Sequence, residues 1–178
     1  MTRITSLQQL RNTLPHCSGQ DYVQIADQME IPVSDFASFA FFHEDHYTRN
    51  CIDRTDEYEL LLLCWEPGQV TPIHGHGGEE CWVYNLQGTI LEKRQEWNEK
   101  SQEVEIIDTT VMNEGQISYM NDHMGFHSLR NTGSDRAMTL HLYINPIDRC
   151  EIYDPEQNDF EIKELHYYTH RGELLEAE

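Results

Sequence analysis

The part of the chain that begins near residue 45 limits the fold most strongly, because it consists of short segments with the composition of β-strands. These segments are rich in β-branched, aromatic and leucine residues, and Gly, Pro and Asn separate them at regular intervals. Many short, evenly spaced strands are typical of a closed antiparallel barrel or a double-sheet jelly roll. Strands are predicted at residues 47–52, 58–65, 70–76, 80–86, 89–97, 103–108, 116–120, 127–131, 138–144 and 161–168.

Hairpin turns are predicted at Gln87-Gly88 and at residues 131–134. The first 45 residues have a helical pattern instead, in which Leu7, Leu10 and Leu14 recur at helical spacing. Two further short helices are predicted there, over residues 21–30 and 35–42. We therefore expect a mainly β chain with a single domain over residues 1–178, divided into a short helical N-terminal segment, 1–45, and a β-barrel, 46–170.

Charge and composition exclude several kinds of partner. The chain has 32 Asp and Glu against 12 Lys and Arg, a formal net charge of −20. Nucleic acid and anionic membranes attract basic surfaces, so we expect neither as a partner. No segment is apolar and long enough to span a membrane, and the N-terminus does not resemble an export signal. The five cysteines contain no Cys-x-x-Cys pair, which together with the N-terminus predicts a reducing, cytoplasmic location.

A pair of histidines predicts a metal site. His74 and His76 lie two residues apart at the end of the predicted strand 70–76, and such residues project from the same face of a strand. His127 is the best candidate for a third ligand, and His123 is its rival. Neutral imidazole binds Fe, Cu, Ni and Zn, so histidine alone does not select the metal. Polar residues on a strand edge are the alternative interpretation.

The surroundings of these histidines resemble the two sequence motifs of the cupin superfamily. Gly68 and Gly88 frame the first pair, and Gly115 and Asn131 frame His127. The resemblance implies a cupin-type jelly-roll β-barrel. In the second motif, however, an asparagine stands where the pattern has proline, and the histidine falls one residue late.

Cys81 occupies the position of the acidic ligand that cupins usually have, and Glu79 or Glu80 is the alternative fourth ligand. Without a carboxylate, three neutral histidines would leave three positions of an octahedral ion open and would not offset its charge. Such a site suits an anionic, chelating substrate.

The resemblance narrows to the cysteine dioxygenase family between about residues 47 and 150. It implies ferrous iron, Fe(2+), on the three histidines, conversion of the small molecules L-cysteine and O2 to cysteine sulfinate, and a monomer or weak oligomer. The segments that carry it are Tyr47-Thr48-Arg49-Asn50, Leu63-Cys64-Trp65, His74-Gly75-His76 with Cys81, Asn121-Asp122 with His127, and Leu140-His141-Leu142-Tyr143 with Pro146 and Cys150.

Arg49 is the predicted anchor of the substrate carboxylate, because a guanidinium binds a carboxylate through two parallel hydrogen bonds and keeps its charge when buried. The resemblance also implies that Tyr47 contacts the substrate. Related dioxygenases that act on 3-mercaptopropionate have glutamine in place of this arginine, so Arg49 favours cysteine. A surface ion pair with a glutamate is the alternative role.

Thr139, His141 and Tyr143 alternate along one predicted strand and so share a face. We expect a hydrogen-bonded row in which His141 orients the Tyr143 hydroxyl at the metal pocket, with Thr139 as support where the family has serine. Plain packing of polar residues in a barrel is the alternative. Cys81 and Tyr143 correspond to a pair that forms a thioether crosslink in animal members of the family, and a small buried thiol is the alternative role of Cys81.

Two other functions fit the same residues. One is a dioxygenase for another thiol, such as 3-mercaptopropionate or cysteamine. The other is a non-catalytic cupin that binds a metal or a small ligand. Oxygen uptake with a panel of thiols distinguishes these functions from cysteine oxidation.

Overall fold

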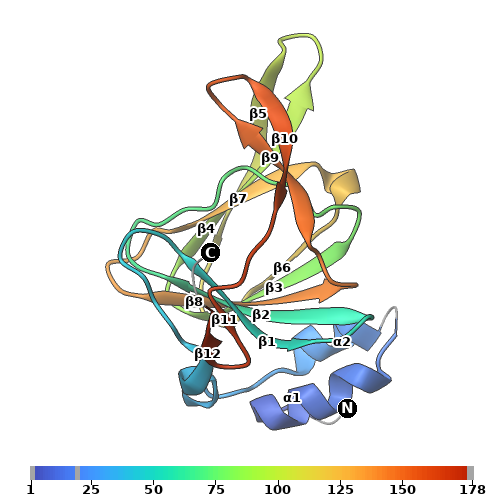
Figure 1. Cartoon of the computed structure of the whole chain (residues 1–178), viewed down its shortest axis with the longest axis vertical. Helices are drawn as coiled ribbons and strands as arrows, with labels where there is room; N and C mark the ends of the chain where they lie inside the picture. The colour runs from blue at the N-terminus through green and yellow to red at the C-terminus, as the bar shows by residue number, and fades with distance from the viewer. Residues whose placement is uncertain (1–2, 19–20, 176–178) are drawn as a thin grey trace.

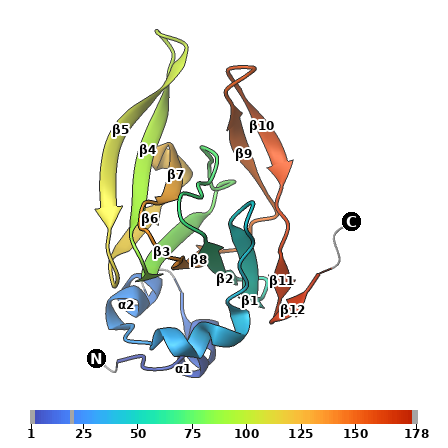
Figure 2. The same ribbon diagram turned by 90° about the vertical axis from the view of Figure 1, so that its left-hand side faces the viewer.

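Short helical segments precede the first strand and lie together at one end of the molecule (Figures 1 and 2). The structure is a computed structural model that describes residues 3–18 and 21–175. The first helix begins after Ser6, whose side chain accepts a hydrogen bond from the backbone N–H of Gln9. The helical segments are α1 (Leu7–Thr13), η1 (Leu14–His16), α2 (Asp21–Gln28), η2 (Val33–Phe39) and, between two strands, η3 (Asp122–Met124).

Within the described residues the strands form three hydrogen-bonded groups. Their orders are β12-β11-β1-β2-β8-β3-β6, β5-β4-β7 and β10-β9. The strands are β1 (Thr48–Arg54), β2 (Tyr58–Trp65), β3 (Glu80–Gln87), β4 (Ile90–Asn98), β5 (Glu103–Met112), β6 (Ile117–Met120), β7 (Phe126–Asn131), β8 (Ala137–Ile144), β9 (Arg149–Asp154), β10 (Asp159–Glu164), β11 (Thr169–His170) and β12 (Glu173–Leu174).

The chain forms two facing β-layers of a cupin-type jelly roll. One layer is the seven-stranded sheet, and the β4–β5 and β9–β10 hairpins of the other extend beyond it (Figure 2). His74 makes isolated bridges to both His127 on β7 and Ile152 on β9, so residues near it join the two smaller sheets. Among the described residues the ladders do not close into one ring. The predicted fold, mainly β with a short helical N-terminal segment, is confirmed.

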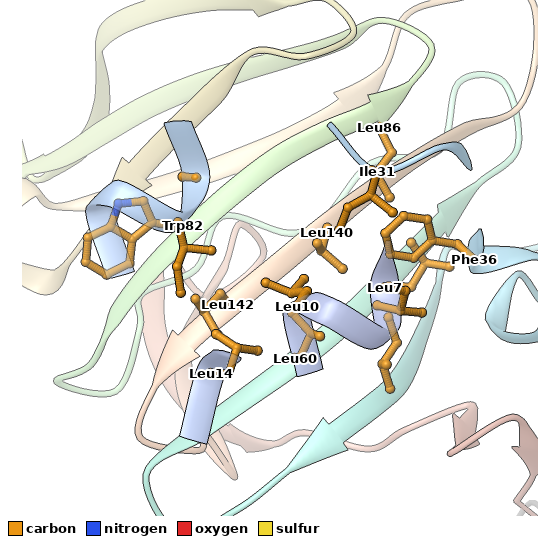
Figure 3. Packing of buried hydrophobic residues seen from close by; sticks show 14 of the residues in the cluster. Leu7, Leu10, Leu14, Ile31, Phe36, Leu60, Trp82, Leu86, Leu140 and Leu142 are labelled. Atoms are coloured by element: carbon orange, nitrogen blue, oxygen red, sulfur yellow. The ribbon is translucent and has the colours of Figure 1, made fainter. Parts of the chain in front are cut away.

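The strands of the large sheet bury side chains on both faces. Leu60 of β2 packs toward the helices, near Leu10 of α1 and Leu140 of β8 (Figure 3). Leu62 belongs to the same cluster. The alternate residues, such as Leu61, point between the two layers and form a second core. Burying a leucine side chain contributes roughly 1.5–3 kcal/mol. Covering by helices on one side and by strands on the other explains the run of apolar residues over positions 60–65 of β2.

Both predicted hairpins are wrong. β3 and β4 flank Gly88 but belong to different sheets, and the same is true of β7 and β8, which flank residues 131–134. Gly88 has φ +85°, and a Cβ atom there would lie 2.7 Å from the Cβ of Ala137. These two turns therefore carry the chain from one layer to the other.

Three predicted segments also differ from the structure. Residues 70–76 make only isolated bridges instead of a strand, since Pro72 has no N–H to donate and Gly75 favours no strand. The strand predicted at 161–168 is β10, which ends at Glu164, and its partner β9 was not predicted. The helix predicted at 35–42 is the 3-10 segment η2.

No helix among the described residues is long and apolar enough to cross a membrane. The division into a single domain stays a prediction, and its ends, residues 1–2 and 176–178, lie outside the described part of the chain.

Candidate metal centre

Three histidines from two places in the fold meet between the β-layers. His74 and His76 lie on the connection between β2 and β3, and His127 lies on β7. The backbone groups of His74 and His127 exchange two hydrogen bonds, of 3.0 and 3.1 Å, which fix the two segments side by side. One ring nitrogen from each histidine lies within 4.8 Å of the others, so the three can hold one ion.

Hydrogen bonds orient two of these rings. Nδ1 of His74 lies 3.0 Å from the carbonyl oxygen of Pro72, and Nδ1 of His127 lies 2.7 Å from Oε1 of Glu92. Because these acceptors hold a proton on Nδ1, Nε2 of each ring is unprotonated, and its lone pair is free to bind a metal. A metal-binding histidine is typically fixed in this way by a partner on its other nitrogen.

The third ring, His76, is held through its backbone. Its N–H donates to Oδ1 of Asp122 at 2.6 Å, and the same carboxylate accepts from the N–H of Gly78. Both ring nitrogens of His76 are buried and have no hydrogen-bond partner among the described residues. A buried polar group without a partner costs free energy, so the ring fits a bound ion better than an empty core.

Burial keeps the rings neutral, which is the form that binds a metal. It lowers the pKa of His74 and lowers that of His127 well below its ordinary value. Burial, together with the two neighbouring rings, lowers the pKa of His76 to about 2. The donor set, its spacing and its protonation therefore fit a divalent transition metal.

Glu92 is a site residue that the sequence reasoning missed. Its side chain is 1% exposed, and besides His127 it contacts the hydroxyl of Ser118, which donates to Oε2 at 2.6 Å. Burial raises the pKa of this carboxyl, and hydrogen bonding to Ser118 and the charge of Arg94 oppose that shift. The sequence did contain a signal for this residue. Glu92 follows the buried Ile90 by two positions, so both side chains face the interior from the same side of the strand.

Arg49 reaches the same region from β1. Its Nη2 is buried without a hydrogen-bond partner among the described residues, while Nη1 donates to the carbonyl oxygen of His166 at 3.4 Å. None of the arginine ion pairs in the described part of the chain includes Arg49, which speaks against the surface-pair alternative. The neighbouring Tyr47 stacks on Trp65, with 4.9 Å between ring centroids.

One cavity brings several of the predicted site residues together. It has a volume of about 30 Å³ and is lined in part by Arg49, Tyr47, His74, His141 and Tyr143. A larger surface cleft of about 370 Å³ shares Tyr47 and Arg49 with it. Arg49 therefore lines both the cavity and the surface cleft.

Within the described residues, the hydrogen-bonded row predicted along β8, from Thr139 through His141 to Tyr143, is longer at the Thr139 end and lacks the hydrogen bond to Tyr143. At one end it includes Trp65, whose Nε1 donates to Oγ1 of Thr139 at 3.0 Å, and Thr139 lies 2.9 Å from Nε2 of His141. At the other end His141 meets Tyr143 by ring stacking, at 6.5 Å between centroids, and no hydrogen bond joins these two residues in the described structure. The two rings are therefore neighbours with nearly parallel planes.

The comparisons with known proteins agree with this arrangement. A family model described as cysteine dioxygenase type I matches residues 2–156. The chain belongs to the cysteine dioxygenase type I family. It is 34% identical to cysteine dioxygenase type 1 of Homo sapiens over 133 residues, which are 73% of this chain and 66%, just under two thirds, of the human protein. It is 27% identical to the protein of the same name from Danio rerio, across 94% of this chain and 89% of that one.

Among solved structures, the chain resembles the protein TT1209 from Thermus thermophilus, with a TM-score of 0.52 and 18% identity over 62% of this chain and 94% of that one. This likeness concerns the fold alone.

In this member of the cysteine dioxygenase family, Cys81 and Tyr143 are direct cross-strand neighbours on β3 and β8. The Cys81 side chain is fully buried, and burial raises the pKa of its thiol and that of the Tyr143 hydroxyl. Both groups are therefore protonated at neutral pH.

The alternative ligands lie outside the cluster of three histidines. Within the described residues, no carboxylate joins that cluster. Glu79 accepts a hydrogen bond of 2.7 Å from Asn145, Glu80 is exposed, and His123 is exposed on η3. Among the described residues, His127 rather than His123 lies in the cluster with His74 and His76.

Proposed function

We propose that the chain is a ferrous-iron-dependent thiol dioxygenase that converts L-cysteine and O2 to cysteine sulfinate. The observation that carries this proposal is that Arg49, which has a buried guanidinium nitrogen with no partner among the described residues, lines the same cavity as His74. The family to which the chain belongs supports the same substrate class.

The metal would be held by Nε2 of His74, Nε2 of His127 and one ring nitrogen of His76. When bound, a ferrous ion supplies open coordination positions at which a thiolate and O2 can meet. Since the three ligands are neutral, the site favours a substrate that brings negative charge.

Arg49 would bind the substrate carboxylate and so fix the position of the thiol. Its Nη2 has no competing partner among the described residues, and a charge-assisted hydrogen bond in a buried site is stronger than one in water. Tyr47, which directly precedes β1 and lines the same cavity, would restrict where the substrate can lie. Orienting the thiol in this way raises its effective concentration at the reacting centre.

Tyr143 would present a protonated hydroxyl to the cavity. Its pKa stays well above the ordinary value because the ring is buried, so the hydroxyl can donate a hydrogen bond to a substrate oxygen throughout the neutral range. The neighbouring His141 ring would keep the Tyr143 ring in place, and His141 is itself hydrogen-bonded to Thr139, which accepts from Trp65.

We propose in addition that Cys81 and Tyr143 form a thioether bond, because they are paired across neighbouring strands. Formation of this bond removes two hydrogens, one from the thiol and one from the ring, and O2 would accept the two electrons and two protons to become H2O2. We expect peptide mass spectrometry after turnover with L-cysteine to find the two peptides joined. Joined peptides should be absent from Cys81→Ser, and unjoined wild-type peptides after turnover would contradict the crosslink.

The location, oligomeric state and partners of the chain are also proposals. We propose a cytoplasmic enzyme, active as a monomer or weak oligomer, which uses neither nucleic acid nor a membrane as a partner. The acidic composition is consistent with the last point.

Oxygen uptake by the iron-loaded protein tests the function. We expect uptake with L-cysteine to exceed uptake with 3-mercaptopropionate and with cysteamine, and His76→Ala to abolish it. Preference for another thiol would contradict the substrate assignment. No thiol-dependent uptake by iron-loaded protein would instead favour a non-catalytic cupin.

A further inference from the structure

The segment that follows β10 packs directly against Arg49. The backbone N–H of Tyr168 donates to the carbonyl oxygen of Arg49 at 2.7 Å. The carbonyl oxygen of His166 accepts from Nη1 of the same arginine at 3.4 Å. Both ends of Arg49 are thus in contact with residues more than a hundred positions later in the sequence.

Between these two residues, Tyr167 places its ring beside the Arg49 guanidinium. The distance from Cζ of Arg49 to the ring centroid is 5.7 Å. At this distance the face of an aromatic ring attracts a cation and restricts how the guanidinium plane can turn. One hydrogen bond of 3.4 Å would not fix that plane by itself, since it is long for an N–H···O bond.

The hydroxyl of Tyr167 is anchored at the other side of the ring. It donates to Oε1 of Glu59 and accepts from Nη1 of Arg54. Glu59 is fully buried near the start of β2, and Arg54 is held in turn by Asp148 at 2.7 Å. A tyrosine tied to a buried carboxylate and to an arginine has little freedom to rotate, so its ring is a rigid surface for Arg49.

We propose that Tyr167 is a positioning residue that holds the Arg49 guanidinium in the plane that receives a substrate carboxylate. The inference rests on the proposed function, because it concerns how the thiol substrate is bound. The contacts indicate which nitrogen would receive the substrate. Nη1 already donates to His166 and the Tyr167 ring restricts the guanidinium plane, so Nη2, which has no partner among the described residues, is the nitrogen left for the carboxylate.

A double-mutant cycle with Arg49 tests this role. Anaerobic binding of L-cysteine to the iron-loaded protein is measured for the wild type, Tyr167→Phe, Arg49→Gln and the double variant. Tyr167→Phe keeps the ring and removes only the hydroxyl anchor, so the protein should fold. We expect its Kd for L-cysteine to rise about 3- to 10-fold, the range of a weakened cation–π contact.

In the Arg49→Gln background the same change should alter Kd less than about twofold, because a residue that acts through Arg49 has nothing left to position. Tyr153→Phe is the matched control and should leave Kd unchanged. Among the described residues, the Tyr153 hydroxyl donates its one hydrogen bond to the exposed Asn158. A further variant, Tyr167→Leu, removes the ring as well as the hydroxyl. Thermal unfolding of every variant shows whether a change in Kd comes from a loss of stability instead of a change in binding.

An unchanged Kd for Tyr167→Phe would overturn the role of Tyr167, and so would an equal loss of affinity in both backgrounds. These results would leave the proposed function intact. Failure of the wild type to bind L-cysteine at all would instead overturn the proposed function and this inference with it.

Discussion

At the scale of single residues, the site depends on groups that orient other groups. Glu92 holds a proton on Nδ1 of His127, and Asp122 holds the backbone of His76. Neither carboxylate belongs to the group of ligands, yet both fix where a ligand nitrogen lies. Polar partners of this kind commonly change metal affinity by about 10- to 100-fold when removed.

Glu92→Gln tests the orientation of His127. The amide cannot act as a charged acceptor for Nδ1–H, so we expect affinity for ferrous iron to fall about 10-fold or more while the fold is kept. Competition with a chelator measures the affinity. Glu96→Gln, an exposed change on the same strand, is the control, and equal iron affinity in the two variants would contradict the role of Glu92.

Arg49→Gln tests substrate recognition. Loss of a charge-assisted hydrogen bond costs roughly 1.5–3 kcal/mol, which corresponds to about a 10- to 100-fold rise in KM for L-cysteine. Use of 3-mercaptopropionate relative to L-cysteine should improve. Steady-state kinetics with both thiols measures the ratio, and an unchanged ratio would remove Arg49 from the specificity role.

At the scale of elements, local patterns predicted most strands and failed where pairing is not local. β2 and β8 were predicted almost to the residue, because both are long apolar segments. β9 was missed because its sequence, Arg-Cys-Glu-Ile-Tyr-Asp, mixes charged with apolar residues and its pattern is weak. Which sheet receives a strand after a glycine turn depends on contacts with distant residues, such as that between Gly88 and Ala137. The turn sequence contains no such information.

Gly88→Ala tests the crossing between the layers. Alanine is strained at the positive φ of this position, and its Cβ would clash with Ala137. We therefore expect a loss of about 2–4 kcal/mol in the free energy of unfolding. Gly68→Ala is the control, because Gly68 has φ +84° but open space around its Cβ, and about 1–2 kcal/mol is expected. Urea unfolding measures both, and equal losses would show that the close contact has no effect.

At the scale of the whole molecule, the acidic composition and the candidate site have opposite character. The formal net charge of −20 describes the exterior, whereas the cavity is lined by neutral histidines and by one cationic arginine. The three candidate ligands could be predicted because the His-x-His pair and His127 lie in motifs with fixed spacing. Tyr167 and Glu92 could not, because each acts through a contact between segments far apart in sequence.

Acid should destabilise the metal-free protein. Burial holds the pKa values of His74, His76, His127 and His141 below the ordinary value of 6.5. Below that pH the unfolded chain takes up protons that the folded chain does not, so stability falls as pH falls, by up to about 1.4 kcal/mol per pH unit for each histidine. Urea unfolding at about pH 7.5 and about pH 5.5 measures the slope. His141→Gln should make it shallower, and a wild-type slope of zero would contradict the buried, neutral rings.

The most direct test of the thiol dioxygenase is the origin of the oxygen atoms in its product. Iron-loaded protein is incubated with L-cysteine under oxygen-18 gas, and the product is analysed by mass spectrometry. We expect cysteine sulfinate in which both sulfinate oxygens are labelled. Absence of sulfinate, or sulfinate with only one labelled oxygen, would contradict the proposal that this site transfers both atoms of O2 to the sulfur of cysteine.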